Sequence, residues 1–181
     1  MCFSRAATAR GMSCAAKASA IGSCWRKISA ADEIRAFDEL MIICSPDHPL
    51  AKFKKLSAKD LIAHPFIDRD PGNGIRQIAD EFFEAAGIAG SEITLCAELG
   101  SLAAIKQLAA AGLGFAIASE RAIRRDVLEG RLAAIRLEPR IYTPLEVLLP
   151  RDKFRSRLIT TFADYVCEEF ARMAKDKGAV I

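Results

Sequence analysis

From Asp38 onward the chain alternates short apolar runs with segments of helical periodicity, and this alternation limits its fold more than any other feature. The runs with the length and composition of β-strands are 41–44, 65–67, 93–99 and 115–118. Between them, apolar residues recur three and four positions apart in 75–86 and again in 102–109, which is the spacing of one helix face. Strands joined by single helices favour parallel pairing through crossover connections, so the pattern predicts the α/β class.

Capping signals mark the ends of the expected helices. Ser57, with Asp60 three positions later, resembles a capping box at the start of a short helix. Ser101 suits the N-cap of the 102–109 helix, and Gly87 is placed to end the helix at 75–86. Further along, the same reasoning predicts a helix at 122–128, strands at 132–137 and 145–149, and an amphipathic helix from about 156 past 170.

The first 36 residues differ from the rest of the chain. They are rich in Ala, Ser, Arg and Cys, and show little periodicity. Five basic residues precede Asp32 with no acidic one among them, so the remainder of the chain carries slightly more acid than base despite a net charge of +3. We expect residues 1–36 to be a non-native or truncated start; an ordered extension and a targeting segment are the alternatives. The folded part carries no concentrated basic face of the kind that binds nucleic acid.

Several classes of function find no support in the motifs. His48 and His64 each adjoin a proline and fit turn positions, and the chain contains no nucleophile elbow, zinc-protease motif or phosphate loop. We therefore expect a non-enzyme with no catalytic residues, no metal site and no cofactor. No apolar run approaches the roughly 20 residues of a membrane span. The six cysteines are scattered, which favours reduced thiols and a cytoplasmic protein.

Small polar residues follow the expected strands, where an open α/β sheet collects its ligands. The candidate binding residues are Ser45, Asn73, Gly74, Ile75, Gly100, Ser101 and Ser119. Two of these positions, Gly74–Ile75 and Gly100–Ser101, also begin helices, whose free N–H groups attract carboxylates and oxyanions. The same residues would also suit an ordinary turn and ordinary helix caps. If they bind a ligand, the pattern favours a small anionic or polar molecule.

Four segments, in order, resemble the effector domain of LysR-type transcriptional regulators. They are 38–50, ending in His-Pro-Leu; 56–67; 70–76, in the place of the effector loop; and 98–117. The run Ala-Ala-Gly-Leu-Gly at 110–114, before an apolar strand, is the most characteristic part. In the effector loop, Asn73 and Ile75 stand where the family often has hydroxyl residues.

The resemblance implies a periplasmic-binding-protein-like fold of two lobes with an effector held between them. Residues 37–175 would form the effector domain. Within it, 38–120 would be one complete lobe with the crossing strands, and 121–175 would be the closing part of the other lobe. It also implies a homo-oligomer, with a dimer as the expected form, whose DNA contact depends on a winged helix that this chain lacks. Because all of them lie at the carboxyl ends of strands expected to be parallel, Asn73, Gly74, Ile75 and Ser101 should form one pocket facing Ser45 and Ser119.

Three functions compete on these grounds. The leading expectation is a truncated sensing and dimerising module of a LysR-type regulator, which binds a carboxylate or another oxyanion. A stand-alone solute-binding module of related fold is the alternative, although the chain shows no secretion signal. An enzyme on a similar scaffold is disfavoured by the missing catalytic motifs.

Overall fold

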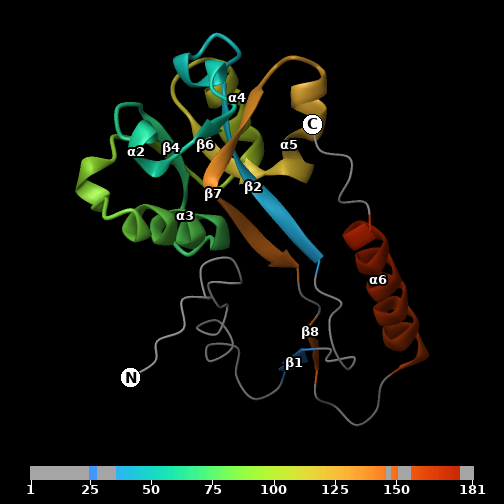
Figure 1. Cartoon of the computed structure of the whole chain (residues 1–181). Helices are drawn as coiled ribbons and strands as arrows, with labels where there is room; N and C mark the ends of the chain where they lie inside the picture. Colours follow the sequence, from blue (N-terminus) through green and yellow to red (C-terminus); the bar gives the residue numbers. More distant parts are fainter. Residues whose placement is uncertain (1–24, 28–35, 146–147, 151–155, 176–181) are drawn as a thin grey trace, which may run out of the picture. The chain divides into compact units, whose positions relative to one another are not determined.

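The computed structural model describes residues 25–27, 36–145, 148–150 and 156–175, which fall into two compact units. One unit runs from Asp38 to Thr143, and the other draws on the chain before and after it. Figure 1 labels most of the helices and strands of both. The Asp38–Thr143 unit contains all seven candidate binding residues.

A mixed sheet forms the centre of the Asp38–Thr143 unit. Its strands are β2 (Ala36–Cys44), β3 (Lys55–Leu56), β4 (Phe66–Arg69), β5 (Leu95–Leu99), β6 (Ala116–Ser119) and β7 (Ala133–Leu145). Four of them pair in the order β3-β7-β2-β6, with β2 and β7 side by side (Figure 1). Strands β4 and β5 pair in parallel, and Phe66 bridges in parallel to Phe115 just before β6. The carboxyl ends of β4, β5 and β6 therefore lie at one edge.

Helices cover both faces of this sheet. They are α2 (Ala58–Leu61), α3 (Gly74–Ala85), α4 (Leu102–Ala110) and α5 (Glu120–Leu128), with short 3-10 helices at Pro49–Lys52 and Gly90–Glu92. On one face, α2 and α3 bury residues such as Leu61 and Phe83 against Leu40, Ile42 and Phe66. On the other, α4 and α5 bury residues that include Ile105 and Ile123 against Met41, Ile43 and Ile67. Alternate residues of each strand serve opposite faces, which explains the nearly unbroken apolar run of β2.

Gly114 lies where β4 and β6 come together. The backbone N–H of Phe115 donates to the carbonyl oxygen of Pro65 at 2.9 Å. A Cβ atom at position 114 would collide with that same carbonyl oxygen. The pairing of the β4–β5 ladder with the rest of the sheet therefore needs a residue without a side chain at this point.

The second unit contains β1 (Trp25–Lys27), β8 (Leu148–Pro150) and α6 (Arg157–Lys175). Strands β1 and β8 pair antiparallel, with Arg26 opposite Leu149. Large apolar side chains of α6 are exposed, among them Leu158, Phe162 and Tyr165. No helix among the described residues is both long and apolar enough to cross a bilayer.

The structure confirms the α/β class and corrects two details of the strands. Strand β2 pairs antiparallel with β6, Leu40 lying opposite Ser119, where the strand–helix alternation predicted parallel pairing throughout. The strand predicted at 132–137 continues as β7 to Leu145, and β7 pairs with β2. The strand predicted at 145–149 is described only as Leu148–Pro150, since residues 146–147 fall outside the described part.

The lobe boundary that the sequence predicts after residue 120 stays a prediction. The compact unit that begins at Asp38 extends to Thr143. The physical reason is the packing of α5 on the same core as α4, through Ile123 and Ile105. An ion pair between Lys106 of α4 and Asp126 of α5, 2.7 Å long, adds to this attachment. Residues 1–24 and 28–35, most of the atypical first segment, lie outside the described residues.

Candidate functional site

The loops after β4 and β5 are adjacent at the carboxyl edge of the sheet. Arg69, the last residue of β4, is the register partner of Leu99, the last residue of β5. The next residue, Asp70, donates its backbone N–H to the carbonyl of Leu99 at 3.3 Å. A Cβ atom at Gly100 would lie 3.3 Å from the Asp70 carboxylate, so the two loops are in contact. The structure thus brings the 70–75 loop and Gly100–Ser101 together.

Each of these loops begins a helix, and its polar residue caps that helix. The side-chain oxygen of Asn73 accepts from the N–H of Ile75 at 2.9 Å at the start of α3. Ser101 accepts from the N–H of Ala104 at the longer distance of 3.5 Å at the start of α4. The Asn73 oxygen is therefore committed to its cap, whereas the Ser101 hydroxyl is held weakly and retains a proton to donate. Ile75 packs its side chain on the core and adds no polar group.

Ser119 begins α5 at the same edge, but its hydroxyl already has an acidic partner. It caps α5 by accepting from the N–H of Ala122 at 3.4 Å, and it donates to the carboxylate of Asp38 in the neighbouring strand β2. Asp38 is 7% exposed, and the Arg121 side chain approaches it to 3.8 Å. A carboxylate of the protein thus occupies the place beside Ser119 where the sequence predicts an anionic ligand.

Ser45 does not join this group. Because β2 is antiparallel to β6, Ile43 lies opposite Ala116 and Ser45 follows at the edge where β6 begins. Its hydroxyl accepts from the N–H of Asp47 at 3.4 Å in a turn. The expectation that Ser45 faces the same pocket as Ser101 and Ser119 is wrong, since it assumed that every strand runs in one direction.

Sequence reasoning missed a charged cluster beside the first two loops. Asp68 of β4 is 6% exposed and pairs with Arg76 of α3 at 3.3 Å. Arg76 also donates to the carbonyl of Arg69 at 2.9 Å and to the carboxylate of Glu98 in β5. Burial raises the pKa of the Asp68 carboxyl, although the Arg69 N–H and the Arg76 charge oppose the shift. An acid inside an apolar strand was the one signal in the sequence that pointed to this cluster.

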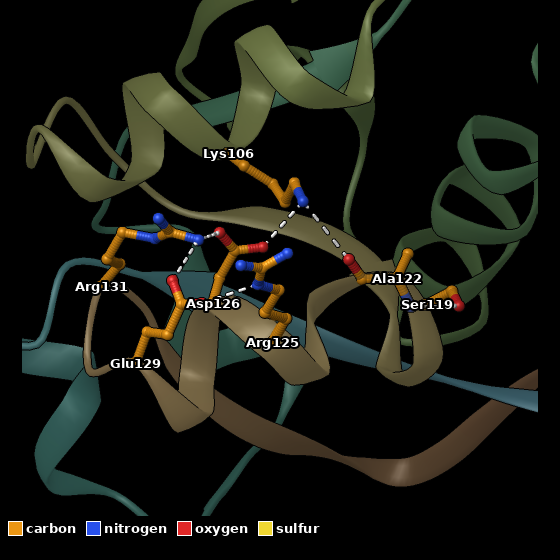
Figure 2. Close-up of polar contacts among 7 residues, drawn as sticks. All are labelled: Lys106, Ser119, Ala122, Arg125, Asp126, Glu129 and Arg131. Atoms are coloured by element: carbon orange, nitrogen blue, oxygen red, sulfur yellow. Dashed lines mark hydrogen bonds and ion pairs between the residues drawn. The ribbon is translucent and has the colours of Figure 1, made fainter.

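A second cluster joins α4, α5 and the start of β7. Figure 2 shows Asp126 between Lys106 and Arg131, each of which donates to it at 2.7 Å. Lys106 also donates to the carbonyl of Ala122 at 3.4 Å, and Arg131 reaches Glu129 at 2.7 Å. These bonds surround a shallow hollow of about 200 Å³. Since the cations of the hollow are already paired with acids, the cluster holds the helices together and offers little charge to a ligand.

The sequence and the fold are both similar to those of a known family of proteins. A family model described as the LysR substrate binding domain matches residues 35–171. The chain belongs to this family. It is 37% identical over 103 residues to a RuBisCO operon transcriptional regulator of Acidithiobacillus ferrooxidans, covering 57% of this chain and 32% of that protein. It is 34% identical over 139 residues to the transcriptional activator CmpR of Synechocystis, covering 74% of this chain and 44% of CmpR. The LysR-family chain thus spans less than half the length of these relatives.

Solved LysR-family domains have the same fold. The regulatory domain of Synechocystis CcmR in complex with 2-PG is 25% identical, with a TM-score of 0.66 over 86% of this chain and 67% of that one. The effector-binding domain of QuiR in complex with shikimate is 17% identical, with a TM-score of 0.66 over 76% of this chain and 63% of that one. The resemblance found in the sequence is confirmed. Among the described residues, no three potential ligands form a metal-binding group.

Proposed function

We propose that this chain is the effector-sensing module of a LysR-type transcriptional regulator and binds a small anion at the carboxyl edge of β4, β5 and β6. The observation that carries the proposal is the contact between the Asp70–Asn73 loop and Gly100–Ser101. This contact places the beginnings of α3 and α4 at one edge of the sheet. Helix beginnings present free N–H groups and a partial positive charge, which suit a carboxylate or another oxyanion.

The ligands of related domains agree in chemistry with this proposal. The QuiR domain holds shikimate, which is a carboxylate, and the CcmR domain holds 2-PG. In this chain the polar groups at the edge include the Asn73 amide, the Ser101 hydroxyl and the backbone of Gly74 and Gly100. Ile75 supplies no side-chain donor, so the ligand would have fewer hydroxyl contacts here than in relatives with hydroxyl residues in the loop.

The whole protein would act as a regulator rather than an enzyme. Residues 38–143 would form one lobe of the effector domain, and β1, β8 and α6 would belong to the other. Sequence-specific DNA contact would come from a winged helix outside these 181 residues, and the module would assemble as a homodimer in the cytoplasm. A mobility-shift assay tests the DNA part: tight, sequence-dependent binding by residues 38–181 would contradict it.

Calorimetry on the full chain tests the binding proposal. We expect 2-PG or shikimate to bind the unmodified protein. Ser101→Ala should weaken that binding roughly 2- to 10-fold, the equivalent of one hydroxyl hydrogen bond. Ser45→Ala is the matched control, because it removes a serine from the opposite edge and should leave binding unchanged. Since Ser101 is also a helix cap, unfolding must be measured alongside; the loss should be about 1 kcal/mol. Equal weakening by both substitutions would refute this site.

A further inference from the structure

Arg69 stands at the centre of the proposed edge. It is the last residue of β4, which lies between β5 and the start of β6. Ile67, two residues earlier, packs on the face covered by α4 and α5. Successive side chains of a strand point to opposite faces, so the Arg69 side chain leaves β4 on this same face. Strand β4 lies between β5, which α4 follows, and β6, which α5 follows. Both helices therefore begin beside the end of β4.

The guanidinium of Arg69 is incompletely paired. Its Nε and one terminal nitrogen are buried, and neither has a hydrogen-bond partner among the residues that the structure describes. Of the two acids beside it in sequence, Asp68 pairs with Arg76, and the carboxylate of Asp70 lies beside Gly100. The residue as a whole is only partly buried, although these two nitrogens are not themselves exposed.

This arrangement is electrostatically incomplete without an anion. A cation beside the beginnings of two helices faces their partial positive charges, and a buried N–H donor without an acceptor costs free energy. One oxyanion would answer both conditions, since a guanidinium presents parallel donors to a carboxylate or phosphate group. At the start of α5, the Ser119 hydroxyl already donates to the Asp38 carboxylate. The ligand would therefore bind on the other side of Arg69, beside Ser101 and the start of α4.

We propose that Arg69 binds the anionic group of the effector, with the Ser101 hydroxyl and the start of α4 beside it. This inference rests on the proposed function and adds the residue that recognises the charge. It also assigns the effector a single oxyanion group directed at α4, because Asp38 would repel a second one at α5.

Thermal unfolding of the full chain with inorganic phosphate, and calorimetry with 2-PG, test the inference. Arg69→Gln removes the charge and the fork of donors, and Arg124→Gln, on the exposed surface of α5, is the matched control. Phosphate and 2-PG should stabilise the unmodified chain and Arg124→Gln alike. Arg69→Gln should bind both roughly tenfold or more weakly, as expected for the loss of a charge-assisted pair. Without any anion, it should unfold no earlier than the unmodified chain, because it loses an unpaired buried charge.

Two different failures can be told apart. If the unmodified chain binds 2-PG and Arg69→Gln binds it within twofold, the edge senses anions but Arg69 is not its anchor. Arg69 is likewise excluded as the anchor if Arg124→Gln weakens binding as much as Arg69→Gln does, because the effect would then be one of net charge. If neither 2-PG, shikimate nor phosphate affects the unmodified chain, the proposed function fails and the role of Arg69 fails with it.

Discussion

Asp68 and Asp126 are both largely buried acids that join two elements of the fold, yet their pKa values move in opposite directions. Asp68 has Arg76 at 3.3 Å, and burial outweighs that single cation, so the pKa of Asp68 is raised. Asp126 has two cations, Lys106 and Arg131, each at 2.7 Å; its bond to Lys106 is the largest cause of a lowered pKa. Deeper burial of Asp68 and closer donors at Asp126 therefore move the two pKa values in opposite directions.

The two acids also differ in what their pairing supports. The Asp126 cluster joins α4 to α5 on one face of the sheet, and the Asp126 carboxylate accepts hydrogen bonds from two cations. The Asp68 cluster lies under the proposed binding edge, where the polar bonds of Arg76 connect α3 with β4 and β5. We therefore expect the edge that would bind ligand to be the less stable of the two regions.

The largest effect should come from Arg76→Gln. It strips Asp68 of its cation and Glu98 of its partner, and it also loses the bond to the Arg69 carbonyl. Removal of one member of a buried pair typically costs about 3 kcal/mol, and protonation of Asp68 would recover part of this. Chemical denaturation should show the loss. A change as small as that of the surface control Arg124→Gln would mean that the cluster contributes little.

Asp126→Asn should have a smaller effect of about 1–2 kcal/mol, as expected for the loss of two charge-assisted hydrogen bonds at a partly exposed site. Lys106 is 24% exposed and Arg131 is 56% exposed, so water would replace much of what the carboxylate provides. The asparagine oxygen can still accept one bond. Urea unfolding measures the change. A loss greater than that of Arg76→Gln would reverse the comparison between the clusters.

The smallest expected effects are on the pH dependence of stability, where Asp68 and Asp126 should act in different pH ranges. The raised pKa of Asp68 means that its contribution is complete below its ordinary value of 3.8 and is lost as pH rises through its raised value. The lowered pKa of Asp126 means that its contribution is present above 3.8 and is lost as pH falls toward its lowered value. Asp68→Asn should flatten the stability curve above pH 3.8, and Asp126→Asn should flatten it below. If both substitutions alter the same side of the curve, the assignment is wrong.

Much of the fold could be predicted because local signals carry it. The spacing of Ile75, Ala79 and Phe82 marked α3, and Asn73 and Ser101 preceded helices that they cap in the structure. Strand direction is different, since the apolar run of β2 is the same whether its neighbour is parallel or antiparallel. This is why the sequence groups Ser45 with Ser119 and the structure separates them.

The candidate site could be predicted only where it follows from a single segment. Turn and cap residues at 73–75 and 100–101 were visible in the sequence, and their contact with an effector remains a prediction. The cluster of Asp68, Arg76 and Glu98 was missed because its members meet only through the register of β4 with β5. Arg69 was missed for a similar reason: an arginine between two aspartates in a turn-like sequence gives no sign that its donors are left without acceptors.

Gly114 sets a limit on how this domain can vary. It belongs to the Ala-Ala-Gly-Leu-Gly run by which the chain resembles its family, and the Pro65 carbonyl leaves no room for a Cβ atom there. Any other residue would push the β4–β5 ladder, with the loops at its carboxyl end, away from β6 and the start of α5. The glycine that makes the family recognisable is also the spacer that keeps the two sides of the proposed pocket within reach of one small molecule.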